Sequence, residues 1–131
     1  MKLLPAAAMC TLALVAAGCG GGDDEPGGRA RLEVVVRPDG PGTQPRRVEL
    51  DCDVLGADAS RSICRRLDGL ARDDLAPVRE DMACAQVYGG PAVATVDGTL
   101  DGEPVQARFD LSDSCEIKRW RRNRALLGAV P

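Results

Sequence analysis

The chain opens with an uninterrupted apolar run instead of a periodic pattern. Leu3 to Ala17 contains no charged residue, and Lys2 supplies a short positive start. A run of this length and flank is typical of a secretory signal and is too short for a stable transmembrane span. We therefore expect residues 1–18 to be a signal peptide and the protein to be exported.

The end of this run contains a second signal, because the small residues Ala17 and Gly18 directly precede Cys19. This arrangement resembles the lipobox of bacterial lipoproteins. The resemblance implies cleavage before Cys19 and a lipid on its thiol, which would hold the protein on the outer side of the cell membrane. The alternative is an ordinary signal peptide and a free secreted protein. Residues 19–30 contain no bulky apolar side chain, so we expect the lipidated cysteine to be followed by a flexible tether.

The remaining domain, residues 31–131, begins with two strand patterns. Leu32–Arg37 is β-branched and apolar, and Arg46–Cys52 alternates between polar and apolar residues. The turn cluster Pro38–Gly42 lies between them. These patterns predict a hairpin with a loose connection.

A second pair of strand patterns follows further along the chain, at Ala92–Leu100 and Pro104–Leu111. Asp101-Gly102 lies between them and is a strong hairpin turn, because both residues tolerate positive φ. Asp97-Gly98 is a weaker rival, since the strand pattern continues after it. We expect these runs to join the first hairpin in an antiparallel sheet.

Two segments have apolar residues at helical spacing. Ser60 is a candidate N-cap for the first helix, whose apolar face comprises Ile63, Cys64, Leu67, Leu70 and Ala71. The charged stretch Leu75–Met82 contains Pro77 and is expected to be irregular. The second helix starts at Asp113 or Ser114, and Asp113 with Glu116 resembles a capping box. One face of this helix comprises Ile117, Trp120, Arg124 and Leu127.

Basic residues on the second helix, namely Lys118, Arg119, Arg121 and Arg122, are expected mostly on its opposite face. They could contact acidic lipid or wall polymer, or they could form a solvated face near the helix C-terminus, where the dipole favours cations. The elements together predict an α+β fold, with an antiparallel sheet of about four to five strands and two helices.

Composition narrows the function. The chain has no histidine, which excludes Ser-His-Asp and Cys-His catalysis and His-based metal sites, and we expect neither an enzyme nor a cofactor or metal. The net charge of −3 argues against a general nucleic-acid binder.

The cysteines predict disulfides. After removal of Cys10 with the signal peptide and lipidation of Cys19, four cysteines remain: Cys52, Cys64, Cys84 and Cys115. An even number in an exported chain predicts two disulfides, and the sequence alone leaves their pairing open.

The order of several motifs is informative. Cys84 and Tyr88 are followed by Pro91, then by the Thr-Val-Asp-Gly-Thr run at Thr95–Thr99, and finally by Cys-Glu-Ile at Cys115–Ile117. This order resembles the subtilisin-inhibitor-like family, from about Leu32 to Trp120. The resemblance implies that family's sandwich fold, with disulfides Cys52–Cys64 and Cys84–Cys115.

The resemblance also implies a substrate-like reactive loop. Its reactive bond lies two residues after the loop cysteine, at Gln86–Val87, and Gln86 would enter the specificity pocket of an extracellular subtilisin-like serine endopeptidase. The protease-binding loop would comprise Met82, Ala83, Cys84, Ala85, Gln86, Val87 and Tyr88. Clamping by the disulfide would reduce the entropy lost on binding and keep both fragments together after cleavage. Gly89 and Gly90 are expected to add conformational freedom to the chain on the C-terminal side of the reactive bond.

Two functions remain from the sequence. The first is a membrane-tethered inhibitor of secreted serine proteases, and the second is a surface lipoprotein that uses the same fold as a binding or structural module. The family resemblance also suggests a homodimer formed through the sheet.

Overall fold

The computed structural model describes residues 29–52 and 58–131. The predicted signal peptide, the lipidation site Cys19 and nearly all of the tether lie outside the described residues. The described elements, in chain order, are β1 (Ala30–Arg37), β2 (Arg46–Asp51), α1 (Asp58–Leu67), α2 (Arg72–Leu75), β3 (Val93–Leu100), β4 (Glu103–Phe109), α3 (Ser114–Arg122) and α4 (Arg124–Leu127).

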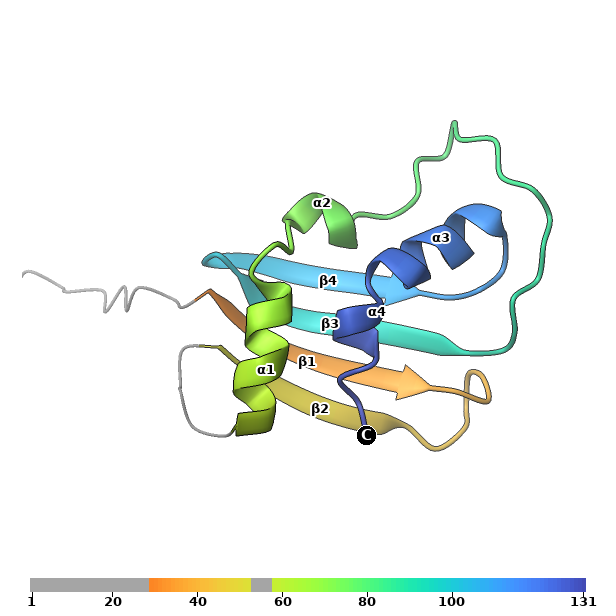
Figure 1. The fold of residues 1–131 in the computed structure, drawn as a ribbon. Coiled ribbons are helices and arrows are strands. Elements are labelled where there is room, and N and C mark those ends of the chain that lie inside the picture. Colours follow the sequence, from red (N-terminus) through yellow and green to blue (C-terminus); the bar gives the residue numbers. More distant parts are fainter. Residues whose placement is uncertain (1–28, 53–57) are drawn as a thin grey trace, which may run out of the picture.

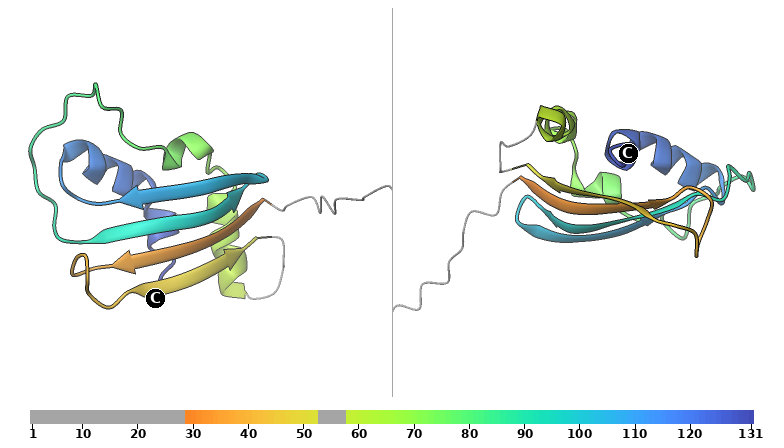
Figure 2. Two further views of the ribbon diagram at one scale, coloured as in Figure 1. Left: turned by 180° about the vertical axis from the view of Figure 1, so that it is seen from behind. Right: turned by 90° about the horizontal axis from the view of Figure 1, so that it is seen from below.

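The strands form one antiparallel sheet in the order β2-β1-β3-β4. The helices cover one face of this sheet and leave the other open (Figures 1 and 2). This arrangement is the predicted α+β fold, built from two longer helices and two short ones. The alternating strands turn their apolar side chains towards the helices, so the core lies between the two layers.

The predicted hairpin turn between β3 and β4 is confirmed. Asp101 has a φ of 51° and Gly102 a φ of 79°, the signs that a type I′ turn requires. Its rival, Asp97-Gly98, lies within β3. Gly98 has a φ of 143°, and a Cβ there would overlap the carbonyl oxygen of Arg31 on β1. Gly98 therefore permits the close approach of β3 to β1 and does not form a turn.

The core consists of aliphatic side chains and one phenylalanine. The largest fully buried apolar residues come from all four strands and from α4: Leu32, Val34, Leu50, Val96, Leu100, Phe109 and Leu126. Leu67 of α1, Leu75 of α2 and Leu127 of α4 also belong to the cluster. The disulfide Cys52–Cys64 links the end of β2 to α1, as the resemblance implied.

The first helix differs from its sequence prediction at both ends. It begins at Asp58, so Ser60 lies inside it and is not its N-cap. It ends at Leu67, and Leu70 follows in a turn closed by a hydrogen bond to the Leu67 carbonyl. Arg29 donates to the carbonyls of Asp68 and Leu70 at 2.7 and 3.1 Å and so stabilises this helix end. The short helix α2 was not predicted, although the irregular chain after Leu75 was.

The predicted C-terminal helix is divided in two. Asp113 caps α3 as expected, and its carboxylate accepts from the amides of Cys115 and Glu116. The helix then stops at Asn123, a buried residue that separates α3 from α4. The Glu116 carboxylate accepts from Arg119 at 3.1 Å, an ion pair within α3 that the capping-box prediction did not include. The two bonds to the Asp113 carboxylate confirm that Asp113 is the N-cap of α3.

Arg119 corrects the prediction of an exposed basic face. Its exposed fraction is 7 %, and its guanidinium lies 4.0 Å from the ring centroid of Phe109. Lys118, Arg121 and Arg122 are exposed, as predicted. Within residues 29–52 and 58–131, the helices are all too short or too polar to cross a membrane.

Candidate functional site

A long irregular segment, from Ala76 to Ala92, connects α2 to β3. In Figure 1 it runs from green to teal and projects beyond one end of the sheet. The first described residues and the β3–β4 turn lie at the opposite end. The segment contains all seven residues predicted to form the protease-binding loop.

The loop exposes apolar surface. Among the described residues, the large hydrophobic side chains that are exposed all belong to it: Met82 at 49 %, Val87 at 51 % and Tyr88 at 71 %. Gln86 is also exposed and lies between them in the chain. Exposed apolar side chains gathered in one place are typical of a surface that binds another protein.

The loop is fixed to the start of α3. The disulfide Cys84–Cys115 is present, the pairing implied by the family resemblance. Next to it, the Ala85 amide donates to Ser114 Oγ at 2.8 Å, and the Ser114 amide donates to the Ala85 carbonyl at 3.0 Å. The residue before Gln86 is thus held through both of its backbone polar groups.

The backbone turns at Gln86. The Val87 amide donates to the Ala85 carbonyl at 2.9 Å, a three-residue turn centred on Gln86. Among the described non-glycine residues only Asp101 has a positive φ, so this is the common inverse γ-turn. Gln86 therefore stands at the apex of a small turn, and the N–H of its bond to Val87 is already paired.

The chain after Tyr88 is held closely, contrary to the expectation that its glycines loosen it. The Gly89 amide donates to the Leu111 carbonyl at 2.8 Å. A Cβ on Gly89 would lie 2.9 Å from Ile117 of α3 and 3.2 Å from Leu111 Cβ. The missing side chain at position 89 therefore permits close packing of the loop.

We expect Gly89→Ala to destabilise the protein by roughly 1–3 kcal/mol, because the added methyl overpacks the contact with Ile117. Gly69→Ala is the matched control, since a Cβ there meets nothing within 4 Å and its φ is not in the positive range. Denaturant unfolding of both variants measures the difference. Equal stability of the two variants would show that the backbone at position 89 moves enough to accommodate the added methyl group.

The beginning of the segment is held by two side chains that the sequence did not indicate. Arg119 donates to the Leu75 carbonyl at 2.7 Å and to the Arg108 carbonyl at 2.6 Å. Asn123 donates to the Asp74 carbonyl at 2.8 Å. The bonds to Leu75 and Asp74 satisfy carbonyls at the end of α2, and the bond to Arg108 ties the same guanidinium to β4. Together they fix the point at which the loop leaves the fold.

An exposed ion pair lies in the first part of the segment from Ala76 to Ala92. Arg79 donates to the Asp81 carboxylate from Nε at 2.9 Å and from Nη2 at 2.6 Å. This bonding lowers the pKa of Asp81 below its ordinary value of 3.8. The pair therefore stabilises this part of the loop above the ordinary pKa, and its contribution disappears as the pH falls through the lowered pKa.

We expect an NMR titration of the Asp81 carboxyl to have its midpoint below 3.8, and we expect Arg79→Gln to return it to about that value. The contribution to stability is small because both side chains are exposed. An unchanged midpoint in Arg79→Gln would mean that the pair is not formed in solution.

A metal site is not supported at the loop. In the part of the chain that the structure describes, one group of three potential ligands comes together: Cys84, Asp113 and Cys115. Both sulfurs belong to the disulfide, so they are not thiolate ligands. The Asp113 carboxylate is engaged as the cap of α3.

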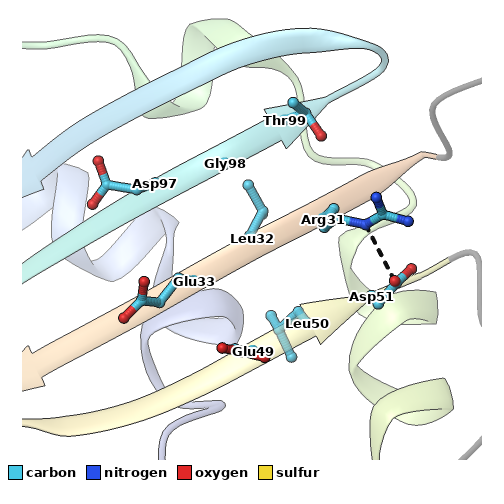
Figure 3. A pocket seen from close by; sticks show the side chains of 9 residues that line it. All are labelled: Arg31, Leu32, Glu33, Glu49, Leu50, Asp51, Asp97, Gly98 and Thr99. Atoms are coloured by element: carbon cyan, nitrogen blue, oxygen red, sulfur yellow. Dashed lines mark hydrogen bonds and ion pairs between the residues drawn. The ribbon is translucent and has the colours of Figure 1, made fainter. Parts of the chain in front are cut away.

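The open face of the sheet contains a shallow hollow, shown in Figure 3. Glu49, Glu33 and Asp97 lie opposite one another on three adjacent strands. Arg47 pairs with Glu33 at 2.9 Å, and Arg31 pairs with Asp51 at 3.2 Å. The hollow is a charged, solvent-facing surface whose acids are partly paired with arginines.

A comparison of the chain with models of known protein families and with curated proteins found no match.

Proposed function

We propose that this protein is an inhibitor of subtilisin-like serine proteases that presents the Gln86–Val87 bond as a substrate-like segment. The observation that carries the proposal is the position of the exposed apolar side chains: Met82, Val87 and Tyr88 flank Gln86 in a loop fixed on both sides. A protease cleft binds an exposed peptide segment through its backbone and its side-chain pockets. Gln86 would enter the primary specificity pocket.

The fixed loop supports inhibition over simple cleavage. The disulfide and the two bonds between Ala85 and Ser114 restrict the segment before it binds, so less entropy is lost in the complex. If the bond were cut, the disulfide would hold one side and the Gly89–Leu111 bond the other. Cleavage would then release neither fragment, and religation would compete with hydrolysis.

We further propose that the protein is exported and anchored outside the membrane through Cys19. Two disulfides are typical of an oxidising compartment outside the cytosol. The start of β1 lies at the end of the sheet opposite the loop (Figure 1). A chain anchored through residues before Arg29 could therefore direct the loop away from the membrane.

The test is inhibition of subtilisin and trypsin by the purified protein and by Gln86→Lys. We expect the original protein to inhibit subtilisin, because a neutral glutamine suits a broad pocket. Gln86→Lys is expected to improve trypsin inhibition by roughly tenfold to a hundredfold, since lysine forms an ion pair with the aspartate of the trypsin pocket.

Gln106→Lys on β4 is the matched control, because this glutamine is also exposed but lies away from the loop. It should leave both inhibition constants unchanged. If Gln86→Lys also leaves both unchanged, Gln86 does not enter the pocket. Absence of inhibition of any serine protease would favour the alternative, a binding or structural lipoprotein.

A further inference from the structure

We propose that Ser114 is the positioning residue that holds the Gln86–Val87 bond and, after cleavage, retains the new Val87 amine for religation. The proposal rests on the inhibitory function proposed above.

The first observation is that the loop completes the N-terminus of α3. The first amides of a helix have no partner within the helix. In α3, the Asp113 carboxylate accepts from the amides of Cys115 and Glu116, at 2.8 and 2.9 Å. The remaining first amide, that of Ser114, donates to the Ala85 carbonyl of the loop at 3.0 Å. The loop carbonyl is therefore fixed to the rigid helix end by a donor that would otherwise need another acceptor.

The second observation links this carbonyl to the proposed reactive bond. Ala85 O also accepts from the Val87 amide at 2.9 Å. The nitrogen that would leave on cleavage is thus bonded to a carbonyl that Ser114 holds. The Ser114 hydroxyl fixes the same residue from its other side, because it accepts from the Ala85 amide at 2.8 Å.

The chemistry of resealing requires this nitrogen to stay close. In the acyl-enzyme, the Gln86 carbonyl carbon is bonded to the serine oxygen of the protease. The Val87 nitrogen has gained a proton from the protease's general acid and is a neutral amine. Religation forms the carbon–nitrogen bond, breaks the carbon–oxygen bond and returns the proton to the protease. An N–H of the amine can donate to Ala85 O while its lone pair faces the acyl carbon.

Three substitutions separate the two contacts of Ser114. Ser114→Ala removes the hydroxyl and keeps the amide, and Ser114→Thr keeps both. Ser114→Pro removes both donor and hydroxyl, yet it suits the fold, because proline is favoured at the first position of a helix. The preceding residue, Asp113, already has the extended backbone that precedes a proline, with φ −152° and ψ 177°. Ser112→Ala is the matched control, since both hydrogen bonds that Ser112 donates among the described residues go to Asp110.

The experiment mixes each purified variant with an equimolar amount of subtilisin and follows the nicked chain by mass spectrometry. Each nicked chain is then isolated and treated with a trace of subtilisin, and the rate at which intact chain reappears is measured. Thermal unfolding confirms that each variant is folded. We expect about fivefold faster nicking in Ser114→Ala and about 25-fold in Ser114→Pro, at about fivefold for each hydrogen bond lost, with resealing slowed by similar factors. Ser114→Thr and Ser112→Ala should behave as the original protein does.

Two results overturn the proposal in distinguishable ways. If the original protein inhibits subtilisin but Ser114→Ala and Ser114→Pro are nicked and resealed at its rates, Ser114 has no positioning role and the inhibitory function stands. If the original protein does not inhibit, the proposed function fails and the role of Ser114 falls with it. If Ser114→Pro alone does not fold, Ser114→Ala and Ser114→Thr still decide between the results.

Discussion

Replacing Cys84 and Cys115 together with serine is expected to convert the protein from an inhibitor of subtilisin into a substrate. The disulfide lies two residues before the proposed reactive bond and joins the loop to α3. Without it, the loop depends on a few exposed hydrogen bonds, and a cut chain can separate from the helix. We expect the double variant to be degraded within the time in which the original protein remains intact.

The same substitution is expected to lower the free energy of unfolding by about 3–4 kcal/mol, because the bridge spans 31 positions and restricts the unfolded chain. The matched control is the Cys52→Ser/Cys64→Ser double variant. This second bridge spans 12 positions, and its loss should cost about 3 kcal/mol while the loop remains clamped. Comparable stability losses with inhibition retained only in the control would assign the effect to the clamp. Full inhibition by the Cys84→Ser/Cys115→Ser variant would count against it.

Arg119→Met is expected to destabilise the protein by about 3 kcal/mol. The substitution leaves the carbonyls of Leu75 and Arg108 without their donor and leaves Glu116 without its cation. It also removes the cation from the face of Phe109. Methionine keeps part of the apolar stem, so the lost stability reports mainly on these polar contacts.

Arg121→Met is the control, because Arg121 lies on the same helix but is exposed. We expect its unfolding free energy to stay within about 0.5 kcal/mol of the original. Denaturant unfolding of both variants measures the difference. We also expect faster amide exchange across Ala76–Met82 in Arg119→Met alone, since Arg119 holds the start of the loop. Equal stability of the two variants would mean that Arg119 is not buried in solution.

The strands could be predicted because their signals are local. The predicted strands Leu32–Arg37 and Arg46–Cys52 differ from β1 and β2 by at most two residues at an end. Asp101-Gly102 correctly predicted the turn between β3 and β4. Alternation in a strand and positive φ in a turn are properties of neighbouring residues. The same holds for Asp113, which caps the helix that begins directly after it.

The contacts that shape the loop were not predictable in this way. Arg119 belongs to a basic run that predicts a solvated face. Besides Glu116 on its own helix, its acceptors are backbone carbonyls 11 and 44 positions away. Helix α2 has four residues, too few for a periodic signal. The partners of Ser114 and Gly89 likewise belong to distant parts of the chain. Spacing between cysteines left three pairings open, and only the family resemblance selected the pairing found here.

The most direct test of the inhibitor proposal is mass spectrometry of an equimolar mixture of the purified protein and subtilisin over time. We predict stoichiometric loss of protease activity, a chain that stays largely intact, and any nick confined to Gln86–Val87. Rapid degradation, or a stable complex cut only at another bond, would contradict the assignment of Gln86–Val87 as the reactive bond of an inhibitor.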